Sequence, residues 1–315
     1  MDLLSDVLLS LKLRSTIISN WQLSEPWGFE TKSFPAGYCF NIVAGELWFS
    51  APDSEPELLL AGDSVLVPIG GEFNFYSSDN APIAPLHALW KGDNFAGFDH
   101  YLPSELHQVN WGGGGAKTTL LSFAFEFQPN VQLDLLKALP SAIILRQYQG
   151  TEFPSFQSAI AFLSQDASNK QPGFVAIAAQ LVELIIIGQL RSYILSETKH
   201  PKGWLQGLLD KKVGKALAAI HRHPEQQWSV TRLAVHAGMS RSSFAQRFQQ
   251  RVGVGPITYL SHWRIQLAAE LLQTTKHSIS EITEIVGWTS DRSFRRLFNQ
   301  RMGKSPLAFR RDAKQ

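Results

Sequence analysis

Two groups of polar side chains near the C-terminal end of the chain have the chemistry needed to contact DNA. An Arg side chain can donate two hydrogen bonds to guanine O6 and N7, and a Gln side chain can pair with adenine N6 and N7. We predict that Gln246 and Arg296 read bases, and that Arg251 and Arg301 hold phosphates or cover the protein's own surface. The first group is Arg241, Ser242, Ser243, Gln246 and Arg247, and the second is Asp291, Arg292, Arg295 and Arg296.

These groups lie in two copies of one sequence pattern. Matching serines and the residues after them are 50 positions apart, and the residues before them are 49 apart. Self-similarity at a fixed spacing indicates a repeated structural unit. The matched pairs include Leu233 and Ile282, Gly238 and Gly287, Ser240 and Ser290, Phe244 and Phe294, Phe248 and Phe298, Gly253 and Gly303, and Pro256 and Pro306.

Each copy predicts a short helix, a glycine turn and a second helix. Ser278 and Glu281 have the spacing of a capping box, which marks a helix start. Gly287 supplies the backbone freedom of a tight turn, and Ser290 is a good N-cap for the next helix. A second helix with a polar, basic face is the helix-turn-helix arrangement that enters the major groove. We place the two motifs at about 229–251 and 278–301, and the duplication favours them over ordinary solvated helices in a bundle.

Over about its last hundred residues the chain resembles the DNA-binding domain of the AraC/XylS transcription regulators. That family ends its second motif with Gly-x-x-Pro, an aromatic residue and Arg, which here are Gly303, Pro306, Phe309 and Arg310. The resemblance implies a linking helix over 256–273 between two recognition helices. At a rise of about 1.5 Å per residue this helix would span about 27 Å, against about 34 Å for one DNA turn. Gln246 departs from the family, which usually has Arg there.

Charge is divided unevenly along the 315 residues, although the formal net charge is only +2. From residue 201 onward there are 19 Lys+Arg and 7 Asp+Glu, a net of +12, which leaves 10 and 20, a net of −10, for residues 1–200. Such asymmetry indicates a nucleic-acid-binding end joined to a part that must not bind nucleic acid. We therefore predict a two-domain α+β protein. Its expected parts are a regulatory domain over 1–164, a linker with a possible dimerisation helix over 165–203, and a DNA-binding domain over 204–315.

The N-terminal part predicts mainly β-structure. Leucines in residues 1 to about 20 predict one helix, and from Trp21 to about Phe127 short strands alternate with turns. A hairpin is expected at Ala44-Gly45, between strands at 38–43 and 46–50, with further strands at 57–60, 64–68 and 73–76. This order resembles the double-stranded β-barrel of the cupins, and the cupin-type effector domain found ahead of many AraC-type DNA-binding domains. The resemblance implies a barrel that can enclose a small ligand.

The barrel lacks the histidines that metal-binding cupins place on two of their strands. The matching positions are Asn41 and Asn74, and amides lack the basic nitrogen that suits transition metals. His87, His100 and His107 show no metal-binding spacing. We therefore predict no metal, no cofactor and no catalytic residue. Asn41 and Asn74 either line an effector pocket or fill the barrel interior.

The remaining features concern the linker and the cellular compartment. The single cysteine, Cys39, excludes a disulfide within the chain and fits a reducing cytoplasm. The apolar stretch 173–190 carries Gln180, Glu183 and Gln189, which are costly in a bilayer, so it predicts a buried or dimer-forming helix over 174–195. A hinge over 198–203 and a helix over 204–220 are expected next. No signal peptide is visible.

These features favour a cytoplasmic, sequence-specific DNA-binding transcription regulator controlled by an unknown small molecule in its barrel. The expected partners are double-stranded DNA, RNA polymerase if the protein is an activator, and a second copy of the chain as a candidate homodimer, with no membrane. Two alternatives stay open. One is a regulator without a ligand, set only by its cellular level. The other is a cupin-type enzyme fused to a DNA-binding domain, which the missing histidines disfavour.

Overall fold

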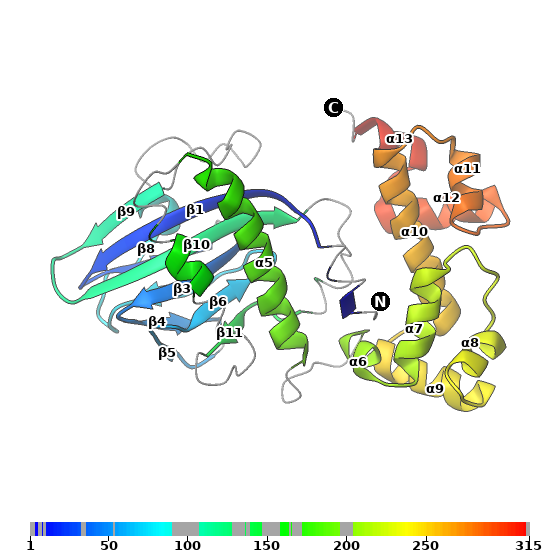
Figure 1. Ribbon diagram of the computed structural model, residues 1–315, viewed down its shortest axis with the longest axis horizontal. Coiled ribbons are helices and arrows are strands. Elements are labelled where there is room, and N and C mark those ends of the chain that lie inside the picture. Colours follow the sequence, from blue (N-terminus) through cyan, green and yellow to red (C-terminus); the bar gives the residue numbers. More distant parts are fainter. Residues whose placement is uncertain are drawn as a thin grey trace. The chain divides into compact units, whose positions relative to one another are not determined.

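The computed structural model of the protein describes residues 11–32, 36–52, 54–89, 107–127, 139–146, 158–163, 172–195 and 204–312, and the single positions 4, 5, 8, 136 and 165. The chain divides into two compact units (Figure 1). One consists of residues 11–129 and 139–195, and the other of residues 196–315 together with 1–10 and 130–138. The first is built on β-sheets and the second on helices, which confirms the α+β, two-domain fold class.

The described residues of the β-rich unit form two sheets. The six-stranded sheet A has the strand order β11-β6-β3-β10-β1-β9, and the five-stranded sheet B has the order β5-β4-β7-β2-β8. Sheet A consists of β1 (Leu13–Ser24), β3 (Gly37–Ala44), β6 (Ser64–Val67), β9 (His107–Gly112), β10 (Lys117–Phe127) and β11 (Ile143–Leu145). Sheet B consists of β2 (Gly28–Glu30), β4 (Glu46–Ser50), β5 (Glu57–Leu60), β7 (Asn74–Tyr76) and β8 (Ala84–Pro85), after which comes the short helix α2 (Leu86–Leu89).

Strand β1 corrects the helix expected for residues 1 to about 20. From Leu13 onward the chain pairs with β10 and β9. Ile17, Trp21 and Leu23 are buried on one face of this strand, as the two-residue period of a strand requires. The adjacent Ile17 and Ile18 also favour a strand, because β-branched side chains pack well on a pleated surface. The helix predicted from the leucine spacing therefore does not extend into β1, which begins at Leu13.

The hairpin expected at Ala44-Gly45 is also wrong. Ala44 pairs with Thr119 of β10, whereas β4 pairs with β5 and β7, so β3 and β4 lie in different sheets. Gly45 turns the chain from one sheet to the other with φ +80°, and a Cβ there would lie 2.6 Å from the Lys117 carbonyl oxygen. The glycine marks a turn, as the sequence indicated, but the turn joins two sheets.

The two sheets share one aromatic core. Phe40 of sheet A lies with its ring centroid 4.9 Å from that of Phe75 and 5.4 Å from that of Phe29, both of sheet B. Trp21 packs on Phe29 at 5.2 Å, and all four side chains are almost fully buried. Such rings each bury a large apolar area and interlock at these distances. The interior between the sheets is thus occupied by large aromatic side chains.

Helix α5 (Phe174–Leu195) covers the outer face of sheet A (Figure 1). Cys39 and Asn41 point to that face because they alternate with the core residues Tyr38 and Phe40. Gln189 of α5 reaches down to them, with Cys39 Sγ donating to its Oε1 at 3.3 Å. Among the described residues, α5 provides the one segment long and apolar enough to span a bilayer, 176–195, and half of that segment is buried in the protein itself.

The helical unit contains eight described helices. They are α6 (Trp204–Leu209), α7 (Val213–Arg222), α8 (Val230–His236), α9 (Arg241–Val252), α10 (Pro256–Thr274), α11 (Ile279–Ile285), α12 (Asp291–Met302) and α13 (Pro306–Asp312). The single helix expected over 204–220 is divided in two at Asp210. The division has a local cause, because Asp210 Oδ1 accepts the backbone N–H groups of Lys212 and Val213 at 3.0 Å each and so caps α7.

Candidate DNA-binding interface

Side-chain caps fix the start of each helix in the two motifs. Ser229 accepts a hydrogen bond from the backbone N–H of Arg232 at the start of α8, and Ser240 accepts one from Ser243 at the start of α9. In the second motif Ser278 and Glu281 form the predicted capping box, and Ser290 accepts from the N–H of Ser293. Each cap satisfies an N–H that has no partner inside its helix. The turns contain Gly238 and Gly287, at φ +62° and +78°.

Paired phenylalanines determine which face of α9 and α12 points outward. Phe244 and Phe248 are fully buried with ring centroids 5.5 Å apart, and Phe294 and Phe298 are fully buried at 5.6 Å. Residues four apart lie on one face of a helix, so each pair faces the core of its own motif. The side chains between them are therefore directed to solvent.

On α12 the outward face is basic. Arg292, Arg295 and Arg296 are exposed, and none of the three forms an ion pair or hydrogen bond with another described residue. Asp291, which the sequence placed in the same group, accepts a hydrogen bond from Ser280 Oγ at 2.8 Å and so ties α12 to α11. This face presents three guanidinium groups to solvent.

On α9 the predicted residues divide into two sets. Arg241, Ser242 and Gln246 are exposed, and Ser243 Oγ accepts a hydrogen bond from Ser240 Oγ at 2.9 Å as part of the helix cap. Arg247 is held by Asp210, whose Oδ2 lies 2.8 Å from both Nε and Nη2 of the arginine.

The Asp210 carboxylate is the residue that the sequence reasoning missed. Its side chain is only 3% exposed, and Arg251 Nε also lies 3.5 Å from its Oδ2. Burial opposes its ionisation, but hydrogen bonds from Arg247 and from the N–H groups of Val213 and Lys212 outweigh burial and lower the pKa of Asp210. One signal was available: the residue equivalent to Arg247 in the second motif is Leu297. A position that is apolar in one copy indicates packing more than DNA contact.

The two asparagines predicted for an effector pocket are not brought together. Asn41, on the outer face of sheet A, donates to the Leu121 carbonyl at 3.1 Å and accepts from Gln189 Nε2 at 3.4 Å. Asn74 is next to the core residue Phe75 and so lies on the outer face of sheet B. Of the three histidines considered, only the side chain of His107 is within the described residues. No group of three or more His, Cys, Asp or Glu among the described residues could hold a metal ion.

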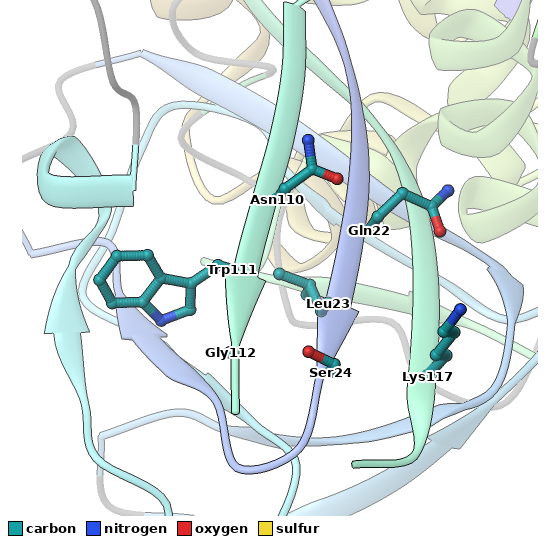
Figure 2. A pocket seen from close by; sticks show the side chains of 7 residues that line it. All are labelled: Gln22, Leu23, Ser24, Asn110, Trp111, Gly112 and Lys117. Atoms are coloured by element: carbon teal, nitrogen blue, oxygen red, sulfur yellow. The ribbon is translucent and has the colours of Figure 1, made fainter. Parts of the chain in front are cut away.

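A pocket of about 640 Å³ lies where β1 and β9 end and β10 begins (Figure 2). It is lined by Gln22, Leu23, Ser24, Asn110, Trp111, Gly112 and Lys117. Asn110 and Trp111 are neighbours on one strand and point to opposite faces, so the lining side chains do not converge on one point (Figure 2). Neither Asn41 nor Asn74 contributes to it.

Comparison with known proteins agrees with this architecture. A family model described as Cupin matches residues 2–195, and one described as Helix-turn-helix domain matches residues 233–312. A putative AraC-like transcription regulator of Streptomyces antibioticus is 30% identical over 320 residues, which cover 99% of each chain. The chain belongs to the AraC-like transcription regulators. Both resemblances predicted from the sequence, to the AraC/XylS family and to its cupin-type N-terminal domain, are confirmed.

Other proteins are similar to all or to part of this chain. The HTH-type transcriptional regulator AlkR of Acinetobacter baylyi is 28% identical over 318 residues, covering 99% of this chain and all of that protein. Among solved structures, the DNA-binding domain of AdpA in complex with a target DNA is 32% identical over 33% of this chain and 92% of that one, with a TM-score of 0.32.

Proposed function

We propose that this regulator reads two successive major grooves, one with α9 and the other with α12. The observation that carries the proposal is a duplicated helix with a set of outward side chains that are exposed and, among the described residues, unpaired with any acidic group. The proposed DNA-contacting residues are Arg241, Ser242 and Gln246 on α9 and Arg292, Arg295 and Arg296 on α12. Ser243, Arg247 and Asp291 contribute by holding the two helices in place.

The helix between the motifs supports this arrangement. Helix α10 has 19 residues and therefore spans about 28 Å at about 1.5 Å per residue. The first motif packs on its N-terminal part, and the second packs on Ile265, Ala268, Ala269 and Leu272 in its C-terminal part. Successive major grooves on one side of DNA are about 34 Å apart. A connection of this length suits two neighbouring grooves.

Selection of binding sites from random-sequence DNA by the purified full-length chain tests the proposal. We expect one enriched sequence with two half-sites centred about one helical turn, 10–10.5 base pairs, apart. Affinity should fall steeply with salt, because bound arginines displace counterions from phosphates. Salt-dependent binding without any enriched sequence would contradict the assignment of α9 and α12 as readers of bases.

We also propose that the N-terminal unit senses a small apolar molecule. Trp27 is fully buried among the aromatic residues between the sheets, and its Nε1–H has no hydrogen-bond partner in the part of the chain that the structure describes. A buried N–H without a partner is rare in folded proteins, and an acceptor atom of a ligand or a water would satisfy it. The surroundings, Phe29 and Phe75 among them, suit a ligand that is otherwise apolar.

A panel of apolar compounds, each with one carbonyl or hydroxyl group, tests this second proposal. A compound that raises the melting temperature of the wild type and changes its DNA affinity should do neither for Trp27→Phe, which keeps the ring packing and lacks the N–H. If every compound leaves both proteins unchanged, a regulator without a ligand is favoured instead.

We propose that the cupin unit has no catalytic metal or cofactor and is no enzyme, so that elemental analysis finds no stoichiometric iron, zinc or manganese and a chelator leaves DNA affinity unchanged. Residues 204–315 are proposed to fold and bind DNA alone, with residues 165–203 forming a linker and a dimerisation helix. Cytoplasmic location, and contact with RNA polymerase if the protein activates transcription, follow from the same function.

A further inference from the structure

The loop that leads into the first motif reaches the turn of the second. Residues 223–228, named here the bridging loop, connect α7 to α8. Gln227 of this loop donates from Nε2 to the carbonyl oxygen of Gly287 at 3.0 Å, a contact between residues 60 positions apart. The loop itself is ordered by the Trp228 Nε1–H, which donates to the His223 carbonyl at 2.8 Å.

The two turn glycines differ in what surrounds them. A Cβ added to Gly287 would lie 2.5 Å from Glu225 Cα and closer still to the Glu225 carbonyl oxygen, so the backbone of the bridging loop touches the turn of the second motif here. A Cβ added to Gly238, the equivalent residue of the first motif, would meet nothing within 4 Å. Both residues have positive φ, so both favour glycine for their own conformation. Only Gly287 is also required by a contact with the bridging loop.

Arg264 of the connecting helix α10 stabilises the same contact by hydrogen bonds to the bridging loop. Its Nε donates to the Pro224 carbonyl at 2.7 Å and its Nη2 to the Gln226 carbonyl at 2.8 Å. The same guanidinium lies with Cζ 6.0 Å from the ring centroid of Trp288 in the second motif. The residue is 8% exposed, and a charged group is retained at such a site only when it is well hydrogen-bonded. One buried side chain therefore joins α10, the bridging loop and the second turn.

We propose that the bridging loop, Arg264 and Gly287 form a clamp that fixes the separation of α9 and α12 and so makes the protein selective for one half-site spacing. The inference rests on the proposed function, in which both helices enter DNA. Inserting one base pair moves a half-site by about 3.4 Å and rotates it by about 35°. A clamped pair of helices cannot follow both changes, whereas a pair joined by α10 alone can adjust.

The test uses the full-length chain and the DNA sequence enriched in the selection experiment, together with versions that have one base pair added or removed between the half-sites. The measured quantity is the ratio of dissociation constants for altered and original spacing. For the wild type we expect a ratio of about ten or more, because only one helix can then be seated. Gly287→Ala should bind the original spacing more weakly and lower the ratio to about three or less.

Gly238→Ala is the matched control, since it introduces the same Cβ at positive φ without touching the other motif. It should keep the wild-type ratio even if its stability falls as far as that of Gly287→Ala. An unchanged ratio in Gly287→Ala, or an equal decrease in both variants, overturns the clamp. If no sequence is enriched at all, the proposed function fails instead, and this outcome is distinct from a wild type that selects a sequence but tolerates both spacings.

Two milder variants keep the test decisive if Gly287→Ala does not fold. Gln227→Ala removes only the hydrogen bond to Gly287 from an exposed side chain, and Arg264→Lys keeps the charge while losing the two-pronged contact with the loop. Both should lower the spacing ratio, Arg264→Lys more than Gln227→Ala. A wild-type ratio in both folded variants contradicts the proposal.

Discussion

The two helix-turn-helix motifs share one pattern but are held in place by different chemistry. In the first, Arg247 of α9 is fixed to the buried Asp210 carboxylate. In the second, the equivalent position is Leu297, which packs against the apolar core of its motif. The turns differ as well, with Met239 in the first and Trp288 in the second, whose Nε1 donates to Ser293 Oγ at 2.8 Å. A recognition helix can thus be fixed by an ion pair or by apolar packing.

This difference changes how an exposed arginine on a recognition helix should be interpreted. Arg247 is 44% exposed, and by type and position it has the features of a DNA contact. Its pairing with a carboxylate from the preceding helix pair shows that it also has a structural role, which is to hold α9 in place. The arginines of α12 have no such partner among the described residues. The exposed basic face without an acidic partner among the described residues is therefore larger in the second motif than in the first.

The largest expected loss of stability comes from a feature that both motifs share, the buried phenylalanines. Phe248→Ala and Phe298→Ala each empty a fully buried position and should each cost about 3–5 kcal/mol of unfolding free energy. Urea unfolding of the full chain, followed by the helical signal in circular dichroism, measures both. A loss below about 1 kcal/mol in one variant only would mean that the two cores are not equivalent.

The next effect should separate the motifs. Asp210→Ala removes the partner of Arg247 and the cap of α7, and should cost about 1–3 kcal/mol of stability, because it leaves buried donors unsatisfied. Asp291→Ala in the second motif loses one exposed hydrogen bond and should cost less than about 0.5 kcal/mol. Equal losses in the same unfolding assay would contradict the contrast between the two helices.

The ion pair between Asp210 and Arg247 should make the stability of the first motif depend on pH. The pKa of Asp210 is lowered from its ordinary value of 3.8, and a carboxyl group of this kind contributes stability that is present above its unfolded pKa and is lost as pH falls through its folded value. The wild type should therefore lose more stability than Asp210→Asn as pH is lowered from about 5 to about 2. Urea midpoints across this range measure the difference, and parallel curves would mean that Asp210 is not the titrating group.

Base recognition should differ between the motifs at a single equivalent position. Arg296→Ala should cost about 1–3 kcal/mol of binding free energy and relax preference at one or two base pairs of one half-site, and Gln246→Ala should do so at the other half-site. Arg247→Ala should leave the base preference and the salt slope unchanged, because its partner is Asp210. Titrations against single-base variants at several salt concentrations distinguish these results. A uniform loss for Arg296→Ala, with specificity intact and the salt slope lower by about one, would assign it to phosphate.

The repeat predicted from the sequence proved to be a reliable guide to local structure. The caps at Ser240, Ser278 and Ser290 and the inward phenylalanines all follow from short-range rules on helix periodicity and capping. What it could not provide were contacts between distant residues. Asp210 and Arg247 are 37 positions apart, and no periodicity relates them.

The N-terminal unit shows the same limit. A strand alternates its faces reliably, so Asn41 had to lie opposite Tyr38 and Phe40, but only the strand pairing shows which face is the core. Here α5 covers the other face, which puts Asn41 under a helix. The turn at Gly45 was visible in the sequence, whereas the sheet to which each flanking strand belongs was not.

The smallest effect concerns the N-caps of the two recognition helices. In the second motif, Ser293 Oγ donates to the Ser290 carbonyl at 2.9 Å and accepts from Trp288, so other bonds hold the start of α12 when the Ser290 hydroxyl is removed. In the first motif, Ser243 is bonded to the Ser240 hydroxyl itself, and that bond disappears with the cap. Ser240→Ala should therefore cost about 1 kcal/mol of unfolding free energy, and Ser290→Ala about 0.5 kcal/mol.

Two double variants check this explanation. One combines Ser290→Ala with Trp288→Phe, and the other combines Ser240→Ala with Met239→Leu. The Trp288→Phe background should increase the cost of removing Ser290, and Met239→Leu should leave the cost of removing Ser240 unchanged. If removing Ser290 costs no more stability in the Trp288→Phe background than in the wild type, Trp288 does not stabilise the start of α12.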